Sequence, residues 1–320
     1  MPQSGKTQVP NVNSFYDRDL LFRAQPLKVH DRWAETKNIP LNNSDTIKFR
    51  RYSNFAAATT PLVEGVTPAG NQLAVTTISA SISQYGDFAI LTDRLTMETE
   101  DPVRLETNKI LGDQAGDTID QVTRDVLVAG TSVIFSGSGN TQTSDVAAGD
   151  VITSGNVDTA EETLKANKAR YMTSFVDPTT GINTTPLPPC FIAIIHTYTT
   201  KTVRAFTGFT KVEKYSNPAD RMVGEIGTYG NTRFIETVNA KVRTGAGTGA
   251  IDVYVTLILA QYAYAAIAIN GASLKNIVKP LGSGGTEDPL DQRETSGWKL
   301  SYTAKILNDD FMVRIEHARV

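Results

Sequence analysis

The sequence of 320 residues is poor in cysteine, histidine and charge. Its single cysteine, Cys190, cannot form an intramolecular disulfide, and a zinc site made of several cysteines is excluded. The three histidines, His30, His196 and His317, lie far apart, and none has the spacing of a metal-binding or catalytic-triad motif. We therefore expect a protein that folds in a reducing compartment and has no metal centre, no cofactor and no catalytic residues.

Charged residues make up 20% of the chain, and the formal net charge is −3. A protein that binds nucleic acid tightly usually carries a basic excess, which this chain lacks. The first thirty residues contain no apolar signal segment. The most apolar stretch, residues 251–270, is rich in β-branched and aromatic residues. We therefore expect two buried strands there and no membrane helix.

A nucleotide-binding loop is also not supported. The segment QSGKTQ at residues 3–8 is similar to the end of a Walker A loop but lacks the first glycine of that motif. In the segment LGSGGTEDPLDQRETSGWK at 281–299, acidic residues follow the glycines, so repulsion disfavours a phosphate. We interpret Gly282, Gly284 and Gly285 as a flexible joint, followed by a turn that a contact of Asp288 or Asp291 with Arg293 would hold.

Alternating apolar and polar residues predict an extended hairpin. Residues 45–52 place Ile47 and Phe49 on one face, and a second alternating run covers residues 74–88. The connecting segment is rich in Gly, Pro, Thr and Ala. Such a hairpin has too little core to be stable alone in water, so we expect something outside it to hold it.

The clearest helix is predicted at residues 102–129. Asp101 is a suitable N-cap, Pro102 suits the first helical position, and Gly130 is a natural stop. Between them, apolar residues recur at three- and four-residue steps. At about 1.5 Å per residue the helix would be roughly 40 Å long.

Further elements are expected towards the C-terminus. They are a helix at 158–172, a buried central strand at 188–196, and a C-terminal hairpin whose strands are 298–307 and 311–317.

Three segments resemble one known family. They are ISQYGDFAILTDRLTMETEDPVRLETNKILGDQAGDTIDQVTRDVLVAGT at 82–131, MVGEIGTYGNTRFIET at 222–237 and GSGGTEDPLDQRETSGWK at 282–299. In order and spacing they are similar to blocks of the major capsid proteins of tailed bacteriophages of the coliphage N-four type, and the match covers most of residues 45–320. The resemblance implies the Hong Kong 97-type capsid fold, which is an α+β fold.

The parts of that fold can be assigned along the chain. The resemblance implies an N-terminal arm at 1–44, an extended loop hairpin at 45–91, a peripheral domain with a long spine helix at 92–134, a mainly axial domain at 135–280, and a glycine joint with a C-terminal hairpin at 281–320 that returns to the peripheral domain.

The implied function is that of a head shell protein, not an enzyme. Copies of the chain would form hexamers and pentamers of an icosahedral head that encloses double-stranded DNA, contacted without sequence preference. Further expected partners are a separate scaffolding protein, a portal protein and decoration proteins, with no membrane; assembly would take place in the bacterial cytoplasm and the product would be the virion. The alternatives are an encapsulin-like shell of a cellular nanocompartment and an enzyme with an unrecognised site.

Charge is distributed unevenly along the chain. Residues 1–53 carry nine Lys or Arg against five Asp or Glu, whereas residues 85–125 carry ten acidic residues against four basic ones. We hypothesise that the basic N-terminal region of one subunit lies across the spine or loop of the next, with charge setting the register. The candidate inter-subunit contact residues are Arg50, Arg51, Glu64, Asp113, Asp117 and Asp120. Residues 52–91 contain no lysine, so the covalent loop crosslink of some shells cannot be placed.

Overall fold

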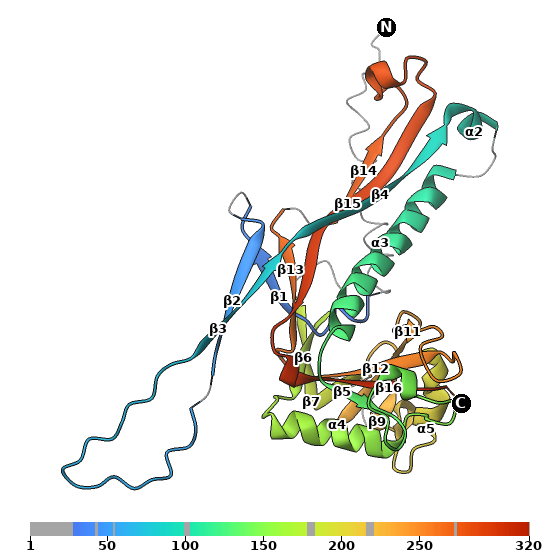
Figure 1. Cartoon of the computed structure of the whole chain (residues 1–320). Coiled ribbons are helices and arrows are strands. Elements are labelled where there is room, and N and C mark those ends of the chain that lie inside the picture. The colour runs from blue at the N-terminus through green and yellow to red at the C-terminus, as the bar shows by residue number, and fades with distance from the viewer. Residues whose placement is uncertain are drawn as a thin grey trace.

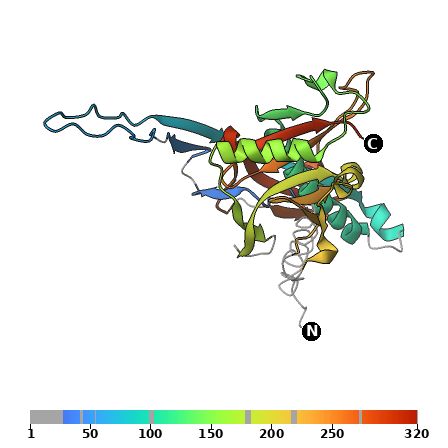
Figure 2. The same cartoon turned by 90° about the horizontal axis from the view of Figure 1, so that it is seen from below.

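The computed structural model describes residues 28–41, 44–53, 55–98, 103–177, 183–215, 221–271 and 274–319. Most of the chain forms two β-sheets and a long helix, and a hairpin with a long loop projects from this body (Figures 1 and 2). Residues 1–27 of the predicted arm lie outside the described residues.

The first sheet has five strands in the order β1-β13-β15-β14, with β4 also paired to β15. Their bounds are Glu35–Ile39 for β1, Ser83–Thr92 for β4, Tyr264–Ile269 for β13, Lys275–Lys279 for β14 and Arg293–Ile306 for β15. The long strand β15 is the centre of this sheet, because it pairs with three of the other four strands.

Helix α3, Val103–Val128, lies along this sheet (Figure 1). Its buried face includes Leu111 and Ile119, which share one apolar core with Trp298 and Leu300 of β15. The predicted helix is thus confirmed to within one residue at each end, because its apolar spacing and its glycine stop are local signals. A short helix α2, Asp93–Glu98, comes between β4 and α3.

The projecting hairpin consists of β2, Thr46–Tyr52, and β3, Val75–Ser81, paired in antiparallel register. Between the strands, the described loop residues have no regular secondary structure. At the base, Ile47 and Phe49 pack against a small apolar cluster that includes Ala265 and Ile267 of β13. The predicted hairpin is confirmed for residues 46–52 and 75–81. The predicted second strand, 74–88, is too long, because residues from Ser83 onwards form β4, which pairs with β15 of the five-stranded sheet. Only the base of the hairpin is supported by the rest of the chain.

The second sheet has nine strands, with the main order β5-β16-β12-β7-β10-β9-β8, and with β11 on β12 and β6 on β7. Their bounds are Val133–Phe135 (β5), Met172–Asp177 (β6), Asn183–His196 (β7), Thr210–Lys211 (β8), Glu225–Tyr229 (β9), Thr232–Thr237 (β10), Val242–Arg243 (β11), Val253–Leu259 (β12) and Met312–His317 (β16). The predicted central strand at 188–196 is the second half of β7, which lies between β10 and β12.

Helix α4, Ser154–Ala166, covers one face of the nine-stranded sheet through Val157 and Leu164. The prediction began this helix at Asp158, four residues too late, because the cap is Thr153, whose hydroxyl accepts from the Asn156 N–H. The remaining helices are short: α5, Thr200–Arg204, and 3-10 turns at Thr143–Asp145, Thr197–Thr199, Val212–Lys214, Gly285–Glu287 and Asp309–Phe311.

The predicted C-terminal hairpin is wrong. Strand β15 belongs to the five-stranded sheet, whereas β16 pairs with β12 and β5 in the nine-stranded sheet. Likewise, the two strands predicted within residues 251–270 exist as β12 and β13 but lie in different sheets. Alternation identified these strands, but it carries no information about their partners.

Among the described residues, the structure has no helix of the length and apolarity that a membrane crossing requires.

The glycine joint is also not where the chain passes between the two sheets. The glycines lie within residues 280–292, which connect β14 with β15, and these two strands are neighbours in one sheet. The passages lie instead at residues 129–132, 260–263 and 307–311. Hydrogen bonds join these three segments. The Leu307 N–H donates to the Ala263 carbonyl at 2.8 Å and so joins the second and third segments. The Thr131 N–H donates to the Asp309 carboxylate at 3.0 Å and joins the first and third.

Candidate subunit-interaction surfaces

The projecting loop carries apolar side chains that touch little of their own chain. The exposed fractions are 55% for Phe55, 79% for Leu62, 67% for Val63, 63% for Val66 and 60% for Leu73. Burying such a side chain stabilises by roughly 1.5–3 kcal/mol relative to leaving it in water. A surface that covered the loop would therefore gain a substantial free energy, which the isolated chain does not obtain.

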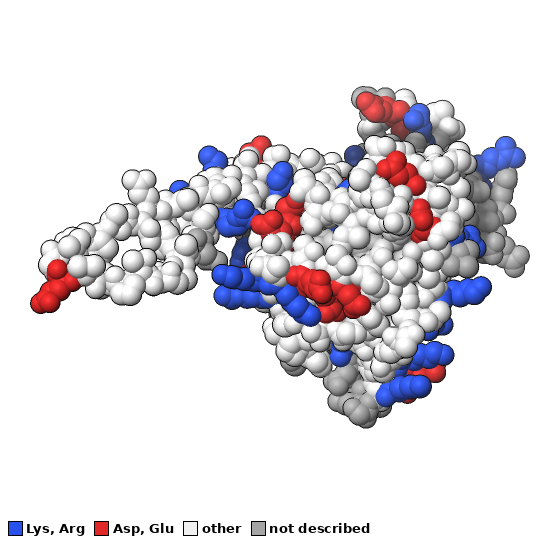
Figure 3. Space-filling model, turned by 60° about the horizontal axis from the view of Figure 1, so that its bottom comes forward, with Lys and Arg blue, Asp and Glu red and all other residues white. Residues whose placement is uncertain are grey.

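The end of the loop is a tight turn. The Val66 N–H donates to the Val63 carbonyl at 3.2 Å, and Gly65 adopts a φ of 77°, which favours glycine. Glu64 lies in this turn and is the only acidic residue between positions 46 and 86. Figure 3 shows the projecting loop almost free of charge, with acidic atoms at its tip. Glu64 is exposed and thus available to a second molecule, as its predicted role requires.

The two arginines at the hairpin base point to opposite faces of β2, since they are consecutive strand residues. Arg51 donates through Nη1 to the Asn308 side chain, at one of the passages between the sheets. Arg50 is exposed and has no ion-pair partner within the part of the chain that the structure describes. Arg50 is therefore the better candidate for an inter-subunit contact.

The three predicted aspartates of α3 do not lie on one surface. Asp113 and Asp117 border a shallow groove of about 580 Å3 along the helix, next to Ile110, which is 67% exposed. Asp117 also accepts from Asn239 Nδ2 at 3.0 Å. Asp120 is fully buried within its own subunit, so its predicted inter-subunit role is wrong.

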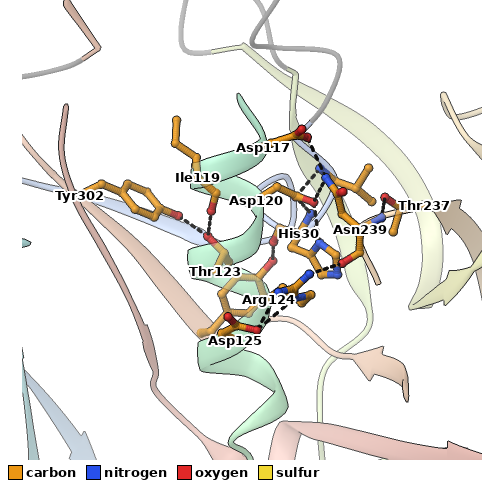
Figure 4. A network of polar contacts seen from close by, with 12 residues as sticks. His30, Asp117, Ile119, Asp120, Thr123, Arg124, Asp125, Thr237, Asn239 and Tyr302 are labelled. Atoms are coloured by element: carbon orange, nitrogen blue, oxygen red, sulfur yellow. Dashed lines mark hydrogen bonds and ion pairs between the residues drawn. The ribbon is translucent and has the colours of Figure 1, made fainter. Parts of the chain in front are cut away.

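Asp120 binds the chain's own N-terminal region (Figure 4). Its Oδ1 accepts from the backbone N–H groups of Val29 and His30, both at 2.7 Å, and its Oδ2 lies 2.9 Å from His30 Nδ1. Burial would raise the pKa of Asp120, but the hydrogen bond and the attraction to His30, together with both backbone donors, hold that pKa below its ordinary value. Residues 28–39 thus belong to the body of this subunit, which the sequence did not reveal.

A groove of about 750 Å3 crosses the face of the five-stranded sheet opposite α3. Gly297 of β15 lies at its centre, flanked in register by Phe88 of β4 and Ile277 of β14, which are 62% and 44% exposed. A side chain at Gly297 would collide with Phe88 Cβ at 2.7 Å and with the Asp87 carbonyl at 2.8 Å. Close approach of the strands therefore requires glycine here, and it leaves a channel between two apolar walls.

Charged residues of both signs border this groove. The basic ones are Lys279, Arg293 and Lys299, and the acidic ones are Asp87, Glu287 and Asp288. Two of the acids are engaged within the chain, because Asp87 accepts from Gln114 at 2.6 Å and Asp288 accepts from the Arg293 N–H at 2.7 Å. Sequence reasoning did not find this groove, since its walls come from three strands that are far apart in the chain.

The three predicted hinge glycines lie at the end of the β14–β15 hairpin. Gly282 and Gly285 have φ values of 81° and 57°, in the region that favours glycine, whereas Gly284 has a φ of −76°. Of the two predicted contacts with Arg293, the one from Asp288 is present, as a bond to the Arg293 backbone. The segment is therefore an ordered turn, and its flexibility remains a prediction.

The described residues contain no group of three or more His, Cys, Asp or Glu side chains arranged to hold a metal ion. Cys190 is buried, and burial raises the pKa of its thiol to about 12. The thiolate that nucleophilic chemistry requires is thus almost unpopulated at neutral pH.

Searches with family models and with curated sequences find no match to this chain. Solved structures do match it. The capsid of Ralstonia phage GP4 has a TM-score of 0.67 at 14% identity and covers 90% of this chain and 87% of that one. The capsid of the cyanophage P-SCSP1u gives 0.61 at 14%, with coverages of 92% and 89%.

The head structure of Helicobacter pylori bacteriophage KHP40 gives a TM-score of 0.61 at 10% identity and covers 100% of this chain and 98% of that one. Identities this low establish the fold alone. They do so over most of the length of each chain. The chain therefore has the Hong Kong 97-type α+β fold of bacteriophage capsid proteins.

Proposed function

We propose that this chain is the major head shell protein of a tailed bacteriophage and that its copies assemble into an icosahedral shell. The observation that carries the proposal is the projecting loop, because five of its large apolar side chains are exposed by more than half. In a soluble monomer these apolar side chains would remain in contact with water, which is unfavourable. An obligate assembly does, because a neighbouring subunit can bury it.

The groove on the five-stranded sheet is the surface that would receive the loop. Its walls, Phe88 and Ile277, are exposed apolar side chains, like Leu62 and Val66 at the end of the loop. Lys299 at the rim would face Glu64, the one acid of the loop. Contacts of this kind repeat around a ring, since the same two surfaces are present on each copy.

Charge would then fix the register of neighbouring subunits. Arg50 at the hairpin base has no partner in its own chain among the described residues, and Asp113 and Asp117 lie along the exposed side of α3. We assign these residues to a contact between copies, in which the charges select the correct alignment more than they add affinity.

The domain names follow from this proposal. Helix α3 with the five-stranded sheet would be the peripheral domain, and the nine-stranded sheet with α4 would be the axial domain, around which hexamers and pentamers close. The coliphage N-four type is the proposed group. Gly282, Gly284 and Gly285 would let the turn between β14 and β15 change its backbone conformation where the peripheral domain meets a neighbouring subunit.

The proposed contents and partners are those of a phage head. The shell would enclose double-stranded DNA, which a chain of net charge −3 would contact without strong binding. A separate scaffolding protein and a portal protein would direct assembly in the bacterial cytoplasm, decoration proteins would bind the finished shell, and the product would be part of the virion.

Electron microscopy of the expressed and purified full chain tests the proposal. We expect closed, uniform particles, or hexamers and pentamers where scaffolding protein is needed to close them. Nucleic acid in particles purified from infected cells would support a phage head over an encapsulin-like compartment, which would contain a protein cargo. A protein that stays monomeric at high concentration, with and without scaffolding protein, would refute it.

A further inference from the structure

A short segment before β1 is inserted between α3 and both sheets. We call residues 28–34 the strap. Four of its side chains are almost fully buried: His30 at 0%, Ala34 and Trp33 at 6% and Arg32 at 7% exposed. The apolar ones belong to the same core as Ile119 of α3. The strap thus completes the main core of the subunit, although it contains no helix or strand.

Polar bonds from three sides hold the strap. Asp120 of α3 binds the N–H groups of residues 29 and 30 and the His30 ring. Tyr264 of β13 donates to the His30 carbonyl, and Tyr302 of β15 donates to Asp31 at 2.6 Å. Arg32 donates to the Val223 carbonyl, before β9 of the other sheet, at 3.3 Å.

Asp120 is the centre of this arrangement, because it accepts three of these bonds. Figure 4 shows its carboxylate between His30 and Asn239, whose Nδ2 lies 3.3 Å from Oδ2. A buried carboxylate without hydrogen-bond partners is very unfavourable. The strap therefore stabilises the ionised form of Asp120, and Asp120 in turn holds the strap in place. His30 Nε2, in contrast, is buried and has no hydrogen-bond partner among the described residues.

We propose that the strap is a latch that opens in acid, and that its opening requires no unfolding of either sheet. When Asp120 binds a proton, its carboxyl group loses the negative charge that attracts the His30 ring and the backbone N–H groups of residues 29 and 30. All three of these contacts to the strap are weakened together. Opening makes residues 28–34 available to other molecules and exposes the apolar core residues that they cover.

The other charged or titratable groups around this site do not take over the role of Asp120. They are Asp117 and Arg124 on α3, Arg32 and the ion pair of Lys28 with Asp31 in the strap, Tyr264 on β13 and Tyr302 on β15. Burial and the nearby Asp31 raise the pKa of both tyrosines well above 10, so their hydroxyls remain donors over the whole range considered. Asp117 reaches Asn239 but not the strap.

The direction of the pH dependence follows from the pKa of Asp120. That pKa is depressed in the folded state, so the contribution of the ionised carboxylate is fully present above the unfolded value of 3.8. This contribution to stability is lost as the pH falls through the lower pKa that Asp120 has in the folded state. The latch is therefore closed at neutral pH, and the strap opens only below pH 3.8.

Tryptophan fluorescence can report on the strap. The chain has two tryptophans, Trp33 in the strap and Trp298 in β15. In the Trp298→Phe variant of the full chain, all tryptophan emission comes from Trp33. We expect this emission to shift to the red at a midpoint below pH 3.8, while the far-ultraviolet circular dichroism keeps its neutral-pH value. A single coincident transition of both signals would overturn the proposal.

Substitution of Asp120 gives a test at neutral pH, with Asp117 as the matched control. In Asp120→Ala, hydrogen exchange of the amides of residues 29 and 30 should speed up by at least about tenfold, since each loses a bond to a charged acceptor. Trp33 emission should shift to the red as well. In Asp117→Ala neither should change. Unchanged exchange in folded Asp120→Ala would refute the latch; if that variant does not fold, the acid titration decides alone.

Discussion

Removing the apolar side chains at the loop tip should abolish assembly without weakening the subunit. In the double variant Leu62→Ser and Val66→Ser, both substituted side chains are more than 60% exposed in the subunit, so its unfolding temperature should not change. If a neighbour buries them, each loss costs roughly 1.5–3 kcal/mol of association free energy. The two losses together amount to about 3–6 kcal/mol per subunit, if they are additive.

Since 1.4 kcal/mol corresponds to a factor of ten, the concentration at which particles appear should rise by about 10²- to 10⁴-fold. Light scattering over a dilution series, with electron microscopy of the endpoints, measures this threshold. Val238→Ser is the control, because Val238 is 75% exposed but lies in the turn after β10, outside the projecting loop. An unchanged threshold in the loop variant would mean that the tip is not at an interface. A lowered unfolding temperature would mean that the loop supports its own subunit.

The remaining predictions concern the hairpin base, the groove and a buried histidine. Arg50→Glu together with Arg51→Glu should block assembly and leave a soluble subunit, as size-exclusion chromatography would show, and normal particles would disprove the charge pairing. Gly297→Ala should destabilise the subunit by about 1–3 kcal/mol in denaturant unfolding, because its Cβ meets Phe88 at 2.7 Å. Gly149→Ala, with nothing within 4 Å, should have little effect, and equal effects of the two would contradict the close-packing argument. Burial lowers the pKa of His317 to about 4, so the unfolded state takes up a proton first as the pH falls below 6.5. The subunit should lose roughly 3 kcal/mol of stability between pH 6.5 and 4, and a His317 NMR titration with a midpoint near 6.5 would refute this.

Local patterns were sufficient for the long helix and the hairpin. The bounds of α3 agree with the prediction because apolar spacing, an N-terminal proline and a terminal glycine all act within a few residues of one another. The first strand of the hairpin and its antiparallel pairing agree for a similar reason, since the pairing follows from one connecting loop. The predicted second strand, 74–88, is in fact two strands, because alternation continues through residue 82 while the partner strand changes. The start of α4 was missed by four residues because two capping sequences, at Thr153 and Asp158, lie only five residues apart.

Partners across long sequence separations were not predictable in the same way. The strands 293–306 and 312–317 were both recognised, but the sequence suggested that they pair with each other. They lie in different sheets, because residues 307–311 form a passage between the sheets and not a hairpin turn. The groove was missed altogether, since Phe88, Ile277 and Gly297 become neighbours only when three strands align.

The acidic residues of α3 show the same limit most clearly. Asp113, Asp117 and Asp120 look alike in the sequence, and all three were interpreted as surface charges for a neighbouring subunit. A spacing of seven residues is close to two full turns, so the first and the last lie on nearly the same side of the helix. Helix geometry therefore does not separate them: Asp120 is buried because the strap covers it with His30.

The sequence by itself determined the α+β elements, the long helix, the projecting hairpin and the segments that resemble capsid proteins, because these depend on the order of neighbouring residues. Only the tertiary structure decided which strands share a sheet, where the chain passes between the two sheets, and which carboxylate is buried. Those properties depend on which distant side chains compete for the same interior space, and no local pattern records the outcome of that competition.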